Sequence, residues 1–226
     1  MKPQYHLKLF DFLSCLSDIL DWISPMLNDH HKQVALIAMR IADAMELPAE
    51  EQNEIVCAGI LHDIGAISLA ERMETLKFEY TTGQGHAEMG YHLINIFPPM
   101  SRAAELIRYH HVYWDNGKGS TYRGQPVPHG SRILQLADRL ALLIDRKKPI
   151  LSQSEAITRR ITGASGSMFE PRVVEIFTEL ANKEYFWLDI ISPLIDKQLK
   201  ENVRLDTVCM NQSELLSLSS LIRRMI

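Results

Sequence analysis

The dipeptide His62-Asp63 carries the side chains best suited to hold two metal ions at one place. An imidazole can bind one ion while the adjacent carboxylate bridges both. The chain has nine histidines, so further nitrogen ligands are available. Because a His-Asp pair also occurs on surfaces and at helix ends, the prediction of a metal site depends on what the rest of the sequence places beside it.

Three further histidines and one aspartate fall on the apolar faces of expected helices, where aliphatic residues recur at spacings of three, four and seven. These candidates are His30, His86, His110 and Asp138. Each alone could be a core side chain satisfied by the backbone, but a buried carboxylate without a partner is strongly unfavourable. Several helices that each point a His or an Asp inward favour a shared metal site. Periodicity leaves the choice between His30 and His31 open, because both begin apolar stripes.

Apolar residues recur mainly at helical spacing along the chain, and the alternation typical of strands is nearly absent. We therefore expect helices to position these candidate ligands. Pro25, Pro48 and the Pro98-Pro99 pair end helical segments, and a polar, Gly-rich loop covers 115–128. The sequence therefore predicts an all-α fold. We expect helices over about 7–23, 29–45, 50–62, 69–76, 86–97, 101–111, 130–146, 152–162, 171–180, 184–200 and 213–226.

The composition excludes several classes of protein. The net charge of −4 offers no basic surplus, so we expect no duplex nucleic acid as a partner. The three cysteines are odd in number and widely spaced, which indicates free thiols in a reducing compartment. Asp11 and Asp18 interrupt the first apolar segment, so it is not a secretory signal, and no apolar run could span a membrane. We expect a cytoplasmic protein with no membrane partner.

A series of motifs follows in order along the chain: His30-x-x-x-Val34, Leu61-His62-Asp63-Ile64-Gly65, His86-x-x-x-Gly90, His110-His111, Arg132-Ile133-Leu134-x-x-Ala137-Asp138 and Phe169-Glu170-Pro171. Their order and spacing resemble the HD superfamily of metal-dependent phosphohydrolases, and within it the HD-GYP subgroup. The resemblance runs from about residue 28 to residue 177. It implies an all-α HD-domain bundle around a dinuclear metal site.

The resemblance also implies which residues bind the metals, and it selects His30 over His31. The implied ligands, with Asp63 as the bridge, are His30, His62, Asp63, His86, His110, His111 and Asp138. Some relatives hold a third ion through a Glu one helical turn before the first His. Met26 occupies that position here, so we expect two ions. Such ligands suit iron, manganese, zinc or nickel, and the resemblance favours iron or manganese.

The chain departs from the subgroup at two positions. Members usually carry a Lys just after the His-Asp-x-Gly run, where its cation would meet a phosphate oxygen, but this chain has Ala66. The loop after the His-His pair usually contains Gly-Tyr-Pro, whereas the loop over 115–121 keeps only the Gly. We therefore consider Lys118, Arg123 and Arg146 as substitutes for the missing substrate-binding charge.

Two cations a few ångströms apart can activate a water and bind the non-bridging oxygens of a phosphoester. The sequence thus predicts a phosphodiesterase-like hydrolase acting on a cyclic dinucleotide or nucleotide, with His62 and Asp63 at its catalytic centre. The alternative is a catalytically weak or inactive metal-binding module that regulates a partner, which the two departures favour. A third reading, a metal-free structural domain, is disfavoured by the complete ligand set.

We expect three segments: an N-terminal helix over 1–27, an HD domain over 28–200, and a linker with an amphipathic helix over 201–226. The last helix presents an apolar face and ends without a polar tail. We therefore expect it to pair with a second copy, as in a homodimer, or to lead into a further domain.

Overall fold

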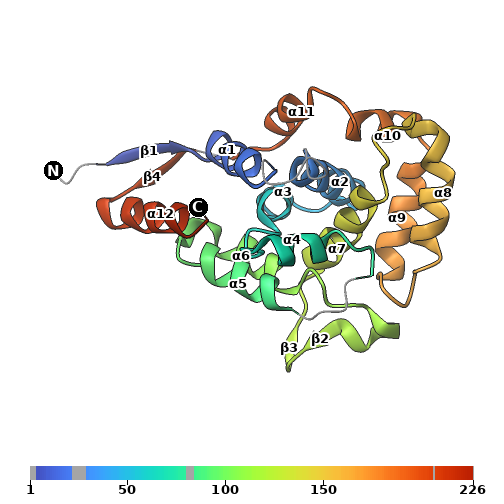
Figure 1. Cartoon of the computed structure of the whole chain (residues 1–226), viewed down its shortest axis with the longest axis horizontal. Helices are drawn as coiled ribbons and strands as arrows, with labels where there is room; N and C mark the ends of the chain where they lie inside the picture. Colours follow the sequence, from blue (N-terminus) through green and yellow to red (C-terminus); the bar gives the residue numbers. More distant parts are fainter. Residues whose placement is uncertain (1–3, 22–28, 80–83, 206, 226) are drawn as a thin grey trace.

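The computed structural model describes residues 4–21, 29–79, 84–205 and 207–225. Its described residues form a helical body with two small sheets (Figure 1). The α-helices are α1 Leu9–Asp21, α2 His30–Ala44, α3 Ala49–Leu61, α4 Leu69–Thr75, α5 Gly85–Ile94, α6 Ser101–Tyr109, α7 His129–Leu142, α8 Ile150–Thr162, α9 Pro171–Ala181, α10 Glu184–Ile190, α11 Ile195–Asn202 and α12 Gln212–Met225. The remaining elements are the short 3-10 helices η2 Pro98–Met100 and η3 Asp115–Ser120 and the strands β1 Tyr5–Lys8, β2 Thr121–Tyr122, β3 Gln125–Pro126 and β4 Thr207–Met210.

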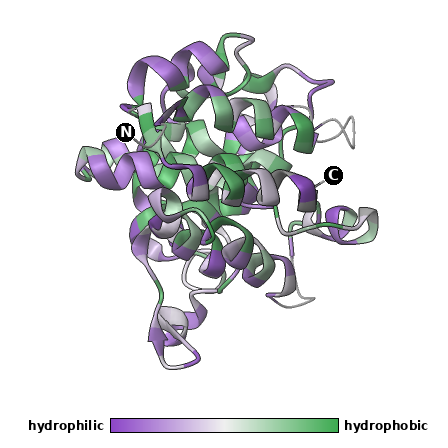
Figure 2. Cartoon of the chain, turned by 90° about the vertical axis from the view of Figure 1, so that its left-hand side faces the viewer, coloured by the Kyte–Doolittle hydropathy of each residue, from purple (hydrophilic) through white to green (hydrophobic). Residues whose placement is uncertain are grey.

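Helix α2 lies at the centre of the body and packs against α1, α3, α7, α9 and α11. Its apolar residues from Val34 to Ala42 are buried on all sides, as is typical of a helix enclosed by others. Gly59 lets α3 approach α2 closely, because a Cβ there would lie 2.8 Å from the Cα of Ala35. Figure 2 shows the resulting pattern, with apolar segments gathered inside and polar segments on the outer faces.

The sequence analysis missed a two-stranded sheet. Strand β1 pairs antiparallel with β4, so that Tyr5 lies opposite Met210 and Lys8 opposite Thr207 (Figure 1). The first helix therefore begins at Leu9 rather than at residue 7, and the stretch expected to be a linker contributes a strand. Four residues are too few to show alternation, and each strand is stabilised by a partner about 200 residues away in the chain.

Several helix ends also differ from the prediction. The expected helix over 184–200 is two helices, α10 and α11, because Pro193 between them lacks an N–H and disfavours a helical conformation at Ser192. Helix α6 ends at Tyr109, which leaves His110 and His111 in the following turn. Asp29 precedes α2 but makes no side-chain capping bond, and Asn28 and Met26 lie outside the described residues. In the described part of the chain, no helix combines the length and the apolarity needed to cross a membrane.

Candidate metal centre

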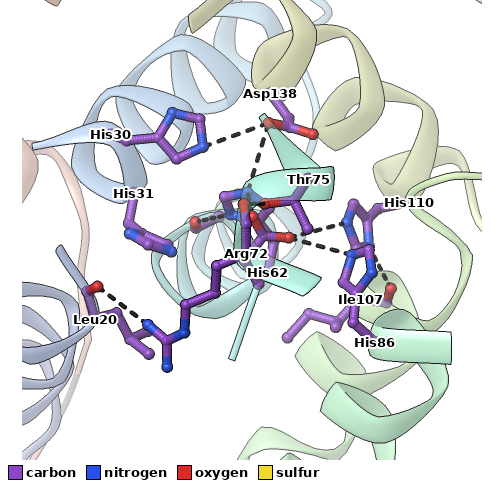
Figure 3. Close-up of polar contacts among 12 residues, drawn as sticks. Leu20, His30, His31, His62, Arg72, Thr75, His86, Ile107, His110 and Asp138 are labelled. Atoms are coloured by element: carbon purple, nitrogen blue, oxygen red, sulfur yellow. Dashed lines mark hydrogen bonds and ion pairs between the residues drawn. The ribbon is translucent and has the colours of Figure 1, made fainter. Parts of the chain in front are cut away.

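The structure brings all seven predicted ligands together in two adjacent groups. Figure 3 labels His30, His62, His86, His110 and Asp138 among them. One group consists of Asp63, His86, His110 and His111, and the other of His30, His62 and Asp138. Within each group the possible ligand atoms all lie within 4.8 Å of one another. The side chains come from α2, α5 and α7 and from the turns that follow α3 and α6, and all seven are buried.

The distances in the second group fit ligands that surround one ion. His30 Nε2 lies 3.4 Å from Asp138 Oδ1, and His62 Nε2 lies 3.6 Å from the same oxygen. Two atoms that each lie about 2.1 Å from a metal ion are separated by about 3.0–3.4 Å at tetrahedral or octahedral angles. The three side chains are therefore close to the spacing that a shared ion requires.

Asp63 faces both groups with different oxygens. Its Oδ1 lies 3.2 Å from His86 Nε2 and 3.8 Å from His110 Nε2, whereas its Oδ2 lies 3.5 Å from His62 Nε2. His111 Nε2 approaches His86 Nε2 at 2.9 Å, which places it in the first group. A carboxylate that offers one oxygen to each side has the geometry of a bridging ligand.

Unsatisfied polar atoms in the two groups support a cation at this place. Four buried ligand atoms make no hydrogen bond within the described part of the chain: His62 Nε2, Asp63 Oδ1, His110 Nε2 and Asp138 Oδ1. A buried polar atom without a partner is destabilising. The donor set of imidazole nitrogens and carboxylate oxygens is the one that transition metals prefer. These residues therefore fit a metal pair.

Main-chain carbonyls fix the orientation of two of the rings. His62 Nδ1 donates to the carbonyl of Gly59 at 2.9 Å, and His110 Nδ1 donates to the carbonyl of Ile107 at 2.6 Å. Each carbonyl lies three residues earlier, in the last turn of a helix, where carbonyls lack a helical partner. Because Nδ1 of each ring is bound to a carbonyl, Nε2 is the nitrogen that faces the site and that would bind a metal in place of a proton, as in most metal-binding histidines.

Gly65 allows the turn after His62-Asp63 to contact α5. A Cβ at Gly65 would lie 2.0 Å from the carbonyl oxygen of His86 and 2.4 Å from the amide nitrogen of Gly90. Only a residue without a side chain permits this approach, which brings His86 within reach of Asp63.

Two buried carboxylates dominate the electrostatics of the site. Burial would raise the pKa of both carboxyls, but His62 holds the pKa of Asp63, and Arg139 that of Asp138, well below the usual range. Burial lowers the pKa of His110 to about 3. Burial would also lower the pKa of His62, yet Asp63 and Asp138 raise it to about 9. Two charged carboxylates and mostly neutral imidazoles make a favourable environment for a divalent cation.

The sequence analysis did not anticipate several charged or polar residues around the site. His31 contacts the buried Asp21 through Nδ1, whereas His30 faces Asp138. Arg72 is buried and donates to the carbonyl of Leu20 at 3.2 Å (Figure 3). Arg139 is buried against Asp138. Arg139 is a charged residue within an apolar stretch of α7. This pattern is the signal from which the sequence could have predicted a buried, paired arginine.

The three candidates for substrate binding lie in different places. Arg146 lines a cavity of about 560 Å³ that also contains His30 and Gln33, and it pairs with Asp29 at 3.5 Å. Lys118 is exposed on η3 and lies 3.6 Å from Asp115. Arg123 stacks over Tyr122 in the hairpin of β2 and β3, which projects from the helical body (Figure 1). Arg146 alone of the three lines a described cavity together with one of the seven predicted ligands.

Residues 27–143 match the model of the HD domain family. The match covers more than half of the chain, so the protein belongs to that family. This confirms the resemblance to the HD superfamily. The matched range contains every residue of the two metal groups.

Two curated relatives are similar over most of the chain. It is 26% identical over 198 residues to the 3′3′-cGAMP-specific phosphodiesterase 1 of Vibrio cholerae, a match that covers 83% of this chain and 45% of that protein. It is 27% identical over 191 residues to a cyclic di-GMP phosphodiesterase of Thermotoga maritima, covering 78% of this chain and 50% of that protein. The chain therefore spans about half the length of the curated relatives it matches.

A solved structure has the same fold. The crystal structure of a cyclic GMP-AMP specific phosphodiesterase from V. cholerae superposes with a TM-score of 0.70, although the sequences are 16% identical. The match covers 99% of this chain and 61% of the other. This likeness confirms the predicted all-α fold.

Proposed function

We propose that this protein is a metal-dependent phosphodiesterase that hydrolyses a cyclic dinucleotide. The observation that carries the proposal is the pair of buried His and Asp groups joined at His62-Asp63. Within the described residues, four of their ligand atoms make no hydrogen bond: His62 Nε2, Asp63 Oδ1, His110 Nε2 and Asp138 Oδ1. The curated relatives support the substrate class, because both are named for cyclic dinucleotides.

The residues of the chain would hold two ions in place. His30, His62 and Asp138 would bind one, His86, His110 and His111 the other, and Asp63 would serve both. When bound, two such ions activate a water and neutralise the charge on a phosphoester for in-line attack. The carbonyls of Gly59 and Ile107 keep the rings of His62 and His110 oriented, so these two rings need not reorient during the reaction. We propose iron or manganese; the ligand set also suits zinc or nickel.

The cavity beside His30 is the proposed place for the rest of the substrate. Its volume of about 560 Å³ lies within the range of small-molecule sites. Arg146 and Lys147 line it and would meet a phosphate that the metals do not reach. Lys118 and Arg123 are secondary candidates, because each lies on the loop after the His-His pair.

The second candidate function is a metal-binding regulatory module with little or no turnover. Ala66 favours it, because the position where relatives carry a lysine is fully buried here and offers no charge. In that case the cavity would bind the cyclic dinucleotide and the complex would act on a partner.

Hydrolysis assays distinguish the two functions. The purified chain, reconstituted with iron or manganese, is incubated with cyclic di-GMP and with 3′3′-cGAMP, and linear products are measured by chromatography. Turnover that disappears in Asp63→Ala establishes the phosphodiesterase. Tight binding of a cyclic dinucleotide by the metallated chain without any product establishes the regulatory module.

We also propose a cytoplasmic location. Cys15, Cys57 and Cys209 are all free thiols, which is the usual state in a reducing compartment. Secretion of the native protein with an intact intermolecular disulfide would contradict this proposal.

A further inference from the structure

Arg139 is the most completely bonded charged side chain beside the metal centre. It is 2% exposed, and Asp138, its neighbour in α7, is 1% exposed. A guanidinium has five N–H donors, and a buried one must satisfy them all. Five hydrogen bonds from Arg139 are present, and they go to only two places in the fold.

The first place is the outer oxygen of Asp138. Arg139 Nε donates to Asp138 Oδ2 at 3.1 Å, and Nη2 donates to the same oxygen. The other oxygen, Oδ1, faces His30 and His62 and makes no hydrogen bond within the described part of the chain. The guanidinium therefore occupies one oxygen and leaves the other free.

The second place is the end of α4 and the segment after it. Nη2 donates to the carbonyl of Thr75 at 3.1 Å, and Nη1 donates to the carbonyls of Lys77 and, at 3.4 Å, Phe78. These acceptors lie more than 60 residues away in the sequence. Phe78 and Glu79 also line a cavity of about 480 Å³. A single side chain thus connects a proposed metal ligand to the wall of a second cavity.

We propose that Arg139 is a positioning residue that restricts Asp138 to one metal-binding oxygen and couples metal binding to the placement of residues 75–79. The inference rests on the proposed metal centre. Groups that hydrogen-bond a metal ligand orient it, and their loss commonly weakens metal binding by about 10–100-fold. Lysine cannot replace the planar fork, because it offers three donors from a single point.

Metal titration tests the first half of the proposal. Dissociation constants for Mn²⁺ are measured by chelator competition for wild type, Arg139→Met and Arg139→Lys. We expect Arg139→Met to weaken the binding of one ion by about 10–100-fold, and Arg139→Lys to remain weaker than wild type. Full restoration by lysine would show that charge alone matters and would overturn the positioning role.

Arg132→Met is the matched control. Arg132 is buried in the same helix, two turns before Arg139, and donates to the carbonyls of Val112 and Gly119 rather than to a ligand side chain. We expect this variant to lose stability but keep wild-type metal affinity. An equal loss of affinity in both variants would overturn the proposal, because destabilisation of α7 would explain it.

Hydrogen exchange tests the coupling. Addition of Mn²⁺ to wild type should slow amide exchange in residues 75–79, and this metal-dependent protection should vanish in Arg139→Met. Metal-dependent protection that persists in the variant would overturn the coupling. A wild-type chain that takes up no metal would overturn the metal centre itself, whereas equal metal binding by wild type and Arg139→Met overturns only the role of Arg139.

Discussion

His62 and Asp63 are consecutive in the chain, yet they belong to different candidate metal groups. His62 Nε2 lies 3.6 Å from Asp138 Oδ1, whereas Asp63 Oδ1 lies 3.2 Å from His86 Nε2. The end of α3 between Gly59 and Gly65 produces this divergence, because His62 is fixed to the carbonyl of Gly59 and the turn after Asp63 packs on α5. One dipeptide therefore joins two candidate sites.

This junction predicts that the two ions depend on one carboxylate. Asp63→Ala should lose both ions, because its two oxygens face both groups. Metal content is measured by elemental analysis after expression with added iron or manganese. The control is Asp189→Ala, which removes a carboxylate that pairs with Arg40 away from the site and should keep two ions per chain. Retention of both ions by Asp63→Ala would rule out the bridging role.

Two neighbouring histidines should give opposite results. His30→Ala should lose the ion shared with His62 and Asp138, because His30 faces Asp138. His31→Ala should keep both ions but lower the unfolding free energy by about 1–3 kcal/mol, because it leaves the buried Asp21 without its hydrogen-bond partner. Metal analysis and thermal unfolding of both variants provide the comparison. If His31→Ala lost metal while His30→Ala kept both ions, His31 rather than His30 would be the ligand.

Gly65→Ala should disrupt the contact between α5 and the turn after His62-Asp63. Its Cβ would lie 2.0 Å from the carbonyl oxygen of His86, so backbone must move, at a cost of about 1–3 kcal/mol. We also expect weaker metal binding, since His86 moves with α5. Gly85→Ala is the control: among the described residues, and apart from its chain neighbours and the backbone of its own helix, no atom lies within 4 Å of its Cβ. This variant should be neutral or more stable by about 0.4–1 kcal/mol. Equal melting temperatures for the two variants would contradict this account.

The sequence predicted the seven His and Asp residues that the structure brings together more completely than it predicted the residues around them. His86, His110 and Asp138 were recognisable because each interrupts an apolar helical stripe, which is a local signal. The partners of Arg139 were not recognisable, because its acceptors are main-chain carbonyls around residue 76 and no side-chain pattern marks them. The β1–β4 sheet was not predicted for a similar reason, because each short strand is stabilised by a partner far away in the sequence.

The C-terminal helix is proposed to pair with a second copy of the chain. Leu216 on α12 is 63% exposed, whereas Leu218 is 5% exposed and packs on the core. Leu216→Asp should therefore shift a dimer toward monomer in light scattering without changing the melting temperature of the body. Leu218→Asp should destabilise the fold itself. A wild-type protein that stays monomeric at high concentration would exclude this pairing. Truncation would then test whether the chain is divided into the three proposed segments.

Substrate recognition should depend on Arg146 only for substrates that reach its cavity. A charged hydrogen bond to phosphate contributes about 1.5–3 kcal/mol, so Arg146→Gln should raise KM for a cyclic dinucleotide by about ten- to a hundredfold. Hydrolysis of a nitrophenyl phosphodiester requires only the metals, so Arg146→Gln should not change its turnover. Arg172→Gln is the control, because Arg172 is exposed and pairs with Glu175, and neither residue lines the cavity. Since Ala66 offers no cation, we also expect wild type to cleave the nitrophenyl ester faster than cyclic di-GMP. Equal effects of Arg146→Gln on both substrates would place Arg146 outside the substrate site and make Lys118 and Arg123 the next residues to test.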